Sequence, residues 1–93
     1  MIRKFSCKET QKIWDGFYSK KLHPIIQEAA RRKLRILNNA FDINDLRIPA
    51  GNYLKKLKGK RNSEWSIRIN DKWRICFIWK DECAVDVQIE DYH

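Results

Sequence analysis

The spacing of apolar side chains predicts helices in the first half of the chain and strands in the second. From Pro24 onwards apolar residues recur at steps of three and four, namely Ile26, Ala30, Leu34 and Leu37. Residues at this spacing lie on one face of a helix, so the pattern predicts an amphipathic helix that ends near Asn38. Pro24 suits its first position, where a backbone N–H would have no helical partner.

The first residues of the chain predict a short strand followed by a short helix. Residues 1–5 form the expected strand, with Ile2 and Phe5 facing inward. Ser6 and Glu9 have the spacing of a capping box, in which two side chains satisfy backbone N–H groups at a helix N-terminus. The helix that follows is expected to bury Ile13, Trp14 and Phe17.

Three later segments alternate apolar and polar residues, which is the pattern of strands with one buried face. They are WSIRI from residue 65, WRICFIW from residue 73 and AVDVQIEDY from residue 84. The short connections at 70–72 and 80–82 suit hairpins, and hairpins imply antiparallel order. The residues expected to face inward are Trp65, Ile67, Ile69, Trp73, Ile75, Phe77, Trp79, Val85, Val87 and Ile89.

A turn-rich and then basic segment separates the two halves. Asp42 is expected to cap one helical turn, which Pro49 and Gly51 prevent from continuing. The stretch NYLKKLKGKR follows. It predicts a strand with a bulge, because Leu54 and Leu57 are three positions apart and break strict alternation.

Together these elements predict an α+β fold in which two N-terminal helices pack on one face of an antiparallel sheet. With 93 residues, the chain is expected to form a single domain over residues 1–93. The sheet face turned away from the helices carries Arg68, Arg74 and Tyr92, and it is expected to remain uncovered.

Composition narrows the range of functions. There are 20 Lys and Arg against 12 Asp and Glu, and the net charge of +8 favours a polyanionic partner such as nucleic acid. The three cysteines lack paired spacing, so we expect neither a disulfide framework nor a metal site, and no cofactor. No run approaches the roughly 18 apolar residues of a membrane span, and the first residues lack the apolar segment of a signal peptide. We therefore expect a cytoplasmic protein.

Basic residues gather around Gly59 and in the middle of two strands. Dense basic residues in a strand and turn can bind phosphates, or they can protect an edge strand from pairing, and the pattern leaves both open. Arg68 and Arg74 are expected either to pair with Asp86 or Glu90 across the sheet or to belong to a functional site. The residues around Gly59 are Lys55, Lys56, Lys58, Lys60 and Arg61.

Three neighbouring side chains that can move protons, Asp91, Tyr92 and His93, follow the last apolar run. They form either a solvated tail or part of an active site. Cleavage of RNA needs a base for the ribose 2′-OH, cations for the phosphorane and an acid for the leaving 5′-oxygen. A cluster of Arg, Lys, Tyr and His suits that chemistry without a metal, and Tyr can also stack a base.

The chain resembles the HigB branch of the RelE superfamily of bacterial toxins. The resemblance rests on seven blocks that occur in order: RKFSCKETQKIWDG, ARRKLRILNNA, DLRIPAGN, LKKLKG, WSIRIND, WRICFIW and EDYH. It implies a fold related to microbial ribonucleases and cleavage of messenger RNA in the ribosomal A site. It also implies that a HigA-like antitoxin protein neutralises the toxin.

The resemblance also implies an active site. It assigns catalytic roles to Asp91, Tyr92, His93, Arg74 and Lys58. His93 or Asp91 is implied as the base or acid, and Tyr92 as the residue that orients or stacks the substrate. Arg74 and Lys58 are implied to stabilise charge.

The remaining basic residues are expected to bind RNA, and Lys55 stands where some relatives have a histidine. The expected partners are the 70S ribosome with its rRNA, messenger RNA, the HigA-like antitoxin, and operator DNA only through that antitoxin. Two alternatives remain: a basic module that blocks the ribosome without chemistry, and a protein that joins its antitoxin in repressing their operon. The residues expected to bind RNA are Lys55, Lys56, Lys60, Arg61 and Arg68.

Overall fold

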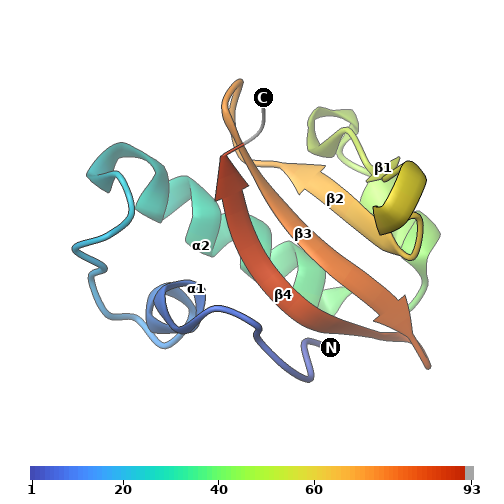
Figure 1. Cartoon of the computed structure of the whole chain (residues 1–93), viewed down its shortest axis with the longest axis horizontal. Coiled ribbons are helices and arrows are strands. Elements are labelled where there is room, and N and C mark those ends of the chain that lie inside the picture. Colours follow the sequence, from blue (N-terminus) through green and yellow to red (C-terminus); the bar gives the residue numbers. More distant parts are fainter. Residues whose placement is uncertain (92–93) are drawn as a thin grey trace.

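Two helices lie on one face of a four-stranded antiparallel sheet, as the sequence predicted (Figure 1). The structure is a computed structural model, and it describes residues 1–91. The strands lie in the order β1-β2-β3-β4. The helices are α1 (Lys8–Trp14) and α2 (Pro24–Asn39), the strands are β1 (Lys55–Lys56), β2 (Glu64–Arg68), β3 (Trp73–Lys80) and β4 (Cys83–Asp91), and the 3-10 turns are η1 (Ile43–Arg47), η2 (Ala50–Asn52) and η3 (Gly59–Arg61).

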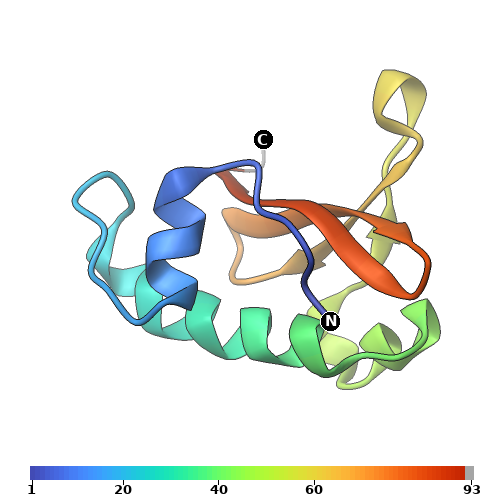
Figure 2. The ribbon, with the colours of Figure 1, turned by 90° about the horizontal axis from the view of Figure 1, so that it is seen from below.

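The helix α2 runs along the sheet and supplies one side of the core (Figure 2). Pro24 occupies its first turn, and the Nδ1 atom of His23 accepts a hydrogen bond from the N–H of Ile25. The predicted stripe is confirmed, because its four members are buried against strand residues such as Phe77. Burial of each large apolar side chain stabilises the fold by about 1.5–3 kcal/mol. The stripe consists of Ile26, Ala30, Leu34 and Leu37.

The short helix α1 differs from the prediction at both ends. Its N-cap is Cys7 without a side-chain cap, so the expected capping box is wrong. The hydroxyl of Ser6 donates instead to the carbonyl of Asp86, and Glu9 accepts from the hydroxyl of Ser19 at 2.6 Å. The helix ends before Gly16, where φ is +93°. The next residue, Phe17, therefore leaves the helical stripe and is 65% exposed rather than buried.

The turns between elements follow local side-chain chemistry. Asp42 caps η1 as predicted, and its carboxylate accepts from the N–H of Asn44 at 2.8 Å. The hairpin between β3 and β4 turns at Asp81 and Glu82, which both have positive φ. Two such residues suit a type I′ turn, which matches the twist of the paired strands.

A β-bulge shifts the alternation of β4. Asp86 has a φ of +52°, and the pairing of β3 with β4 is irregular between Cys76 and Ile78. As a result Val85 pairs with Ile78 on the face away from the helices, and Ala84 is buried in its place. The expectation that Val85 faces inward was wrong, because an inserted residue reverses a period of two.

The outer edge of β4 is covered by the first residues of the chain. The predicted first strand consists of two isolated parallel bridges, which pair Ile2 with Ala84 and Phe5 with Val87. Beyond them, the N–H of Ile89 donates to the buried hydroxyl of Thr10 in α1 at 3.0 Å. These contacts give backbone groups along the edge of β4 hydrogen-bond partners as far as Ile89.

Candidate active site

The sheet face away from the helices is partly covered, contrary to the expectation of an open face. Ser66, Arg74 and Cys76 are all buried on it. The guanidinium of Arg74 donates through Nε to the Ser66 hydroxyl at 2.9 Å and through Nη2 to the carbonyl of Tyr53 at 2.8 Å. The chain before β1 therefore folds back over the sheet, and Tyr53 makes this turn in the left-handed region with φ of 43°.

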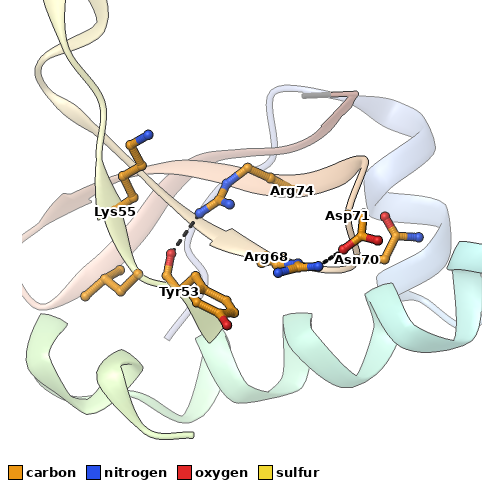
Figure 3. A pocket seen from close by; sticks show the side chains of 7 residues that line it. Tyr53, Lys55, Arg68, Asn70, Asp71 and Arg74 are labelled. Carbon is orange, nitrogen blue, oxygen red and sulfur yellow. Dashed lines mark hydrogen bonds and ion pairs between the residues drawn. The ribbon is translucent and has the colours of Figure 1, made fainter. Parts of the chain in front are cut away.

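Two arginines face each other on this side of the sheet. Arg68 of β2 and Arg74 of β3 are direct partners in the strand register. Like charges at opposed positions repel each other, so an anion placed between them is favoured. Arg68 forms an ion pair with Asp71, and its guanidinium lies over the ring of Tyr53, 5.1 Å from the centroid. These contacts fix the orientation of both guanidinium groups (Figure 3).

A pocket of about 450 Å³ opens beside this pair of arginines. Its basic residues come from three strands, with Lys55 on β1, Arg68 on β2 and Arg74 on β3 (Figure 3). Cations that converge on a hollow from separate strands can hold the phosphate oxygens of a nucleic acid. The lining residues are Tyr53, Leu54, Lys55, Arg68, Asn70, Asp71 and Arg74.

The basic segment around Gly59 contains much less strand than expected. Lys55 and Lys56 pair with β2, the N–H of Leu57 donates to the carbonyl of Glu64 at 2.9 Å, and the chain then enters η3. The ammonium of Lys56 lies 5.4 Å from the centroid of the Trp65 ring. Lys58 and Lys60 are exposed and lie outside the lining of the pocket. The segment therefore presents its lysines to solvent beside the pocket.

Arg61 occupies a different environment from the lysines. Its guanidinium binds the carboxylates of Glu64 and Glu90, and so forms an ion pair that spans the sheet. Arg61 and Gln88 hold the pKa of Glu90 below its ordinary value, mainly through the hydrogen bonds from Arg61. Burial, with Glu90 as a second cause, raises the pKa of the Cys76 thiol to about 12. In this cluster one guanidinium faces two carboxylates, beside the buried thiol of Cys76.

The end of β4 places Asp91 on the opposite face from Arg74. Asp91 is the register partner of Trp73, whereas Arg74 is the partner of Glu90. The carboxylate of Asp91 lies 3.7 Å from the ammonium of Lys72. Residues 92 and 93, which carry the predicted Tyr92 and His93 roles, lie outside the described residues. The structure therefore brings together Arg74, Arg68 and Lys55. Asp91 is opposite the residue before Arg74, so it lies on the other face of the sheet.

Sequence analysis missed Tyr53 as a residue of the site. Its ring and carbonyl contact both arginines. A signal was present, because an aromatic residue next to a Gly-Asn turn and a basic run is typical of nucleic-acid contacts. In the part of the chain that the structure describes, no group of three His, Cys, Asp or Glu side chains is arranged to hold a metal, and no helix has the length and apolarity needed to cross a membrane.

The same architecture occurs in a solved structure of another bacterial protein. The crystal structure of a mutant of YafQ from E. coli matches with a TM-score of 0.63, covering 98% of this chain and 93% of that chain. At 12% identity this likeness shows the fold alone. The class defined so far is an α+β domain with helices on one face of the sheet and a cationic pocket on the other.

Sequence comparison identifies the family. A model of the HigB-like toxins, described as RelE-like toxins of the type II toxin–antitoxin system HigB, matches residues 4–93, and the chain belongs to this family. Toxin HigB-1 of Vibrio cholerae serotype O1 is 33% identical over 93 residues, which span 99% of this chain and 98% of that protein. An uncharacterized protein of Haemophilus influenzae is 43% identical over 51 residues, 55% of this chain and 48% of its own length. A type II toxin acts with an antitoxin partner, and the resemblance noted in the sequence is confirmed.

Proposed function

We propose that this toxin is a ribosome-dependent endoribonuclease that cleaves messenger RNA in the ribosomal A site. Membership of a RelE-like toxin family supports an endoribonuclease. The observation that carries the proposal is the pair of opposed arginines, Arg68 and Arg74, beside a pocket of about 450 Å³. Two guanidinium groups held at opposed strand positions favour a phosphate group between them.

The proposed reaction is an internal transfer at phosphorus. A base removes the proton of the ribose 2′-OH, and the 2′-oxygen forms a bond to phosphorus. The bond to the 5′-oxygen breaks, and an acid protonates that leaving oxygen. The products are a 5′-OH and a 2′,3′-cyclic phosphate. Addition of water to the cyclic phosphate, with cleavage of its bond to the 2′-oxygen, then gives a 3′-phosphate. Arg74 and Lys58 stabilise the charge of the phosphorane, and the hydrogen bonds to Ser66 and Tyr53 preorganise Arg74 for this role.

The proton-transfer roles belong to the residues at and beyond the end of β4. In this proposal His93 or Asp91 is the base or acid, and Tyr92 orients or stacks the substrate. Lys55, Lys56, Lys60 and Arg68 bind the RNA backbone. The assignment of Asp91 rests on the family resemblance, because its strand position places it on the opposite face of the sheet from Arg74. The HigA-like antitoxin, which neutralises the toxin, is the proposed partner, and the cytoplasm with its ribosomes is the proposed location.

Primer extension on a message tests the proposal directly. We expect strong cleavage on translating ribosomes and weak cleavage of the same RNA alone, because the ribosome positions the message and orientation supplies several kcal/mol. Equal rates on ribosome-bound and naked RNA would show that the ribosome is not required. Blocked translation without any cut would favour a basic module that occupies the ribosome without chemistry.

Variants beyond the end of β4 test the catalytic assignment. Deletion of His93, or Tyr92→Ala, should lower the cleavage rate by about 10²–10⁴. The melting temperature should stay near that of the parent, because neither change removes a residue of the described core. Binding of the antitoxin serves as the control for a folded toxin. A truncated toxin that still arrests growth and cuts at the parental rate would remove His93 from the mechanism.

A further inference from the structure

Arg61 forms ion pairs with Glu64 and Glu90, which lie in distant parts of the sheet. We call this set of three residues the clasp. Its Nε and Nη2 atoms donate to the two oxygens of Glu64 at 2.8 and 2.9 Å. Its Nη1 atom donates to Oε1 of Glu90 at 2.9 Å, and Nη2 also donates to Oε2 of Glu90. One guanidinium therefore binds two carboxylates, each through both oxygens. Bidentate pairs of this kind are the most directional ion pairs in proteins.

The two carboxylates lie on strands that do not touch each other. Glu64 begins β2 and Glu90 is near the end of β4, with β3 between them. Glu90 is additionally held by the side-chain amide of Gln88 at 3.0 Å. Arg61 itself ends η3, the turn that carries the exposed Lys58 and Lys60. The clasp thus joins the basic segment, residues 55–60, to the last strand.

The residue next to the clasp is buried, and the donors of Arg61 are occupied by the two carboxylates. Cys76 of β3 faces this cluster and is 3% exposed. Its register partner is Gln88, which holds the same carboxylate as Arg61 does. Although the Arg61 side chain is 42% exposed, its donors are directed at acceptors on the sheet. A cation engaged in this way on four hydrogen bonds is poorly placed to bind phosphate.

We propose that Arg61 is a positioning residue whose clasp with Glu64 and Glu90 holds the basic segment against the end of β4. The clasp fixes Lys58 relative to Asp91, which follows Glu90 directly in the chain. This role rests on the proposed function, and it differs from the RNA-binding role expected from the sequence. Displacement of catalytic groups by about 1 Å lowers rates by about 10²-fold, so a looser clasp should lower turnover.

Glu90→Gln separates a positioning role of Arg61 from an RNA-binding role, because the two roles predict different effects on ribosome binding and on kcat. The substitution removes a negative charge, so a surface that only binds RNA should hold the ribosome as well as before or better. A broken clasp should instead lower kcat by about 10–100-fold and leave KM near its parental value. Arg61→Lys is the second variant. It keeps the charge but cannot bind two carboxylates in a bidentate manner, so it should also lower kcat.

Lys60→Gln is the matched control, since it removes one positive charge from the same turn and leaves the clasp intact. It should weaken ribosome binding slightly, because it removes a cation that the proposed function places on the RNA backbone. Amide hydrogen exchange of the free toxin reports the clasp without ribosomes, and protection of residues 57–63 should fall in Glu90→Gln but not in Lys60→Gln. Failure of the parental toxin to cut RNA would refute the proposed function, and exchange would still decide whether Arg61 holds the segment. Unchanged protection, or a kcat for Glu90→Gln within about twofold of the parental toxin, would overturn the positioning role.

Discussion

Thr10→Val should destabilise the toxin although it preserves the shape of the side chain. Thr10 is fully buried in α1, and its hydroxyl accepts the N–H of Ile89 at 3.0 Å. Valine replaces the hydroxyl with a methyl group and leaves this buried donor without an acceptor. Because Ile89 is also buried, water has little access to it.

The expected cost follows from the orphaned donor. An unsatisfied buried N–H costs about 1–3 kcal/mol, which is more than the extra methyl group returns, about 0.8 kcal/mol. For a domain of this size each kcal/mol lowers the melting temperature by about 4–8 °C. Thr10→Ser is the matched control. It keeps the hydroxyl and removes one methyl group, so it should cost about 1 kcal/mol and keep the amide protected.

Urea denaturation measures the global effect, and amide exchange measures the end of β4. We expect Thr10→Val to lower the free energy of unfolding and to raise the exchange rate of the Ile89 amide, with Thr10→Ser close to the parent in exchange. The reasoning fails if Thr10→Val stays within about 0.5 kcal/mol of the parent and the Ile89 amide keeps its protection. The hydroxyl would then contribute nothing to the edge of β4.

Three further predictions concern charge and protonation. Cys76 should resist alkylation at pH 8 while Cys83 reacts, because burial raises the pKa of Cys76 to about 12; equal rates by mass spectrometry would contradict this. Lys56→Ala with Lys60→Ala should reduce the salt dependence of ribosome binding without changing the cleavage products, and an unchanged slope would show that these lysines are merely solvated. Because the pKa of Glu90 is lowered from its ordinary value of 4.5, its ionised carboxylate stabilises the folded protein at pH values above 4.5. This contribution to the free energy of unfolding should be lost in acid titrations as the pH falls through the lowered pKa. Glu90→Gln should flatten that part of the titration.

Much of the fold could be predicted because its signals are local. The stripe of α2 from Ile26 to Leu37 and its start at Pro24 depend only on spacing and on the chemistry of a helix end. The cap at Asp42 is equally local. Ile75 and Phe77 were predicted inward from alternation alone, and both are fully buried.

The features that the sequence did not predict depend on contacts between distant residues. Asp86 adopts a left-handed conformation and shifts the phase of β4, which alternation does not reveal. Arg61 lies 29 positions from Glu90, so their pairing needs the strand order and the register. The hydrogen bonds of Arg74 to the Ser66 hydroxyl and to the carbonyl of Tyr53 were not predicted, because the sequence indicated only an acidic partner or a functional site for this residue. Such contacts follow from the three-dimensional arrangement of the sheet.

Independent contacts converge on the last residues of β4 from three directions. The hydroxyl of Thr10 holds Ile89 at the outer edge, and Arg61 holds Glu90 from above the sheet. On the inner edge, Asp91 pairs with Trp73 of β3. Proton transfer requires groups to be held within fractions of an ångström, and sites on supported strands meet this requirement better than sites on loops. If the residues beyond Asp91 carry the chemistry, loosening any of these contacts should lower turnover even where the net charge, and with it the attraction to RNA, is unchanged.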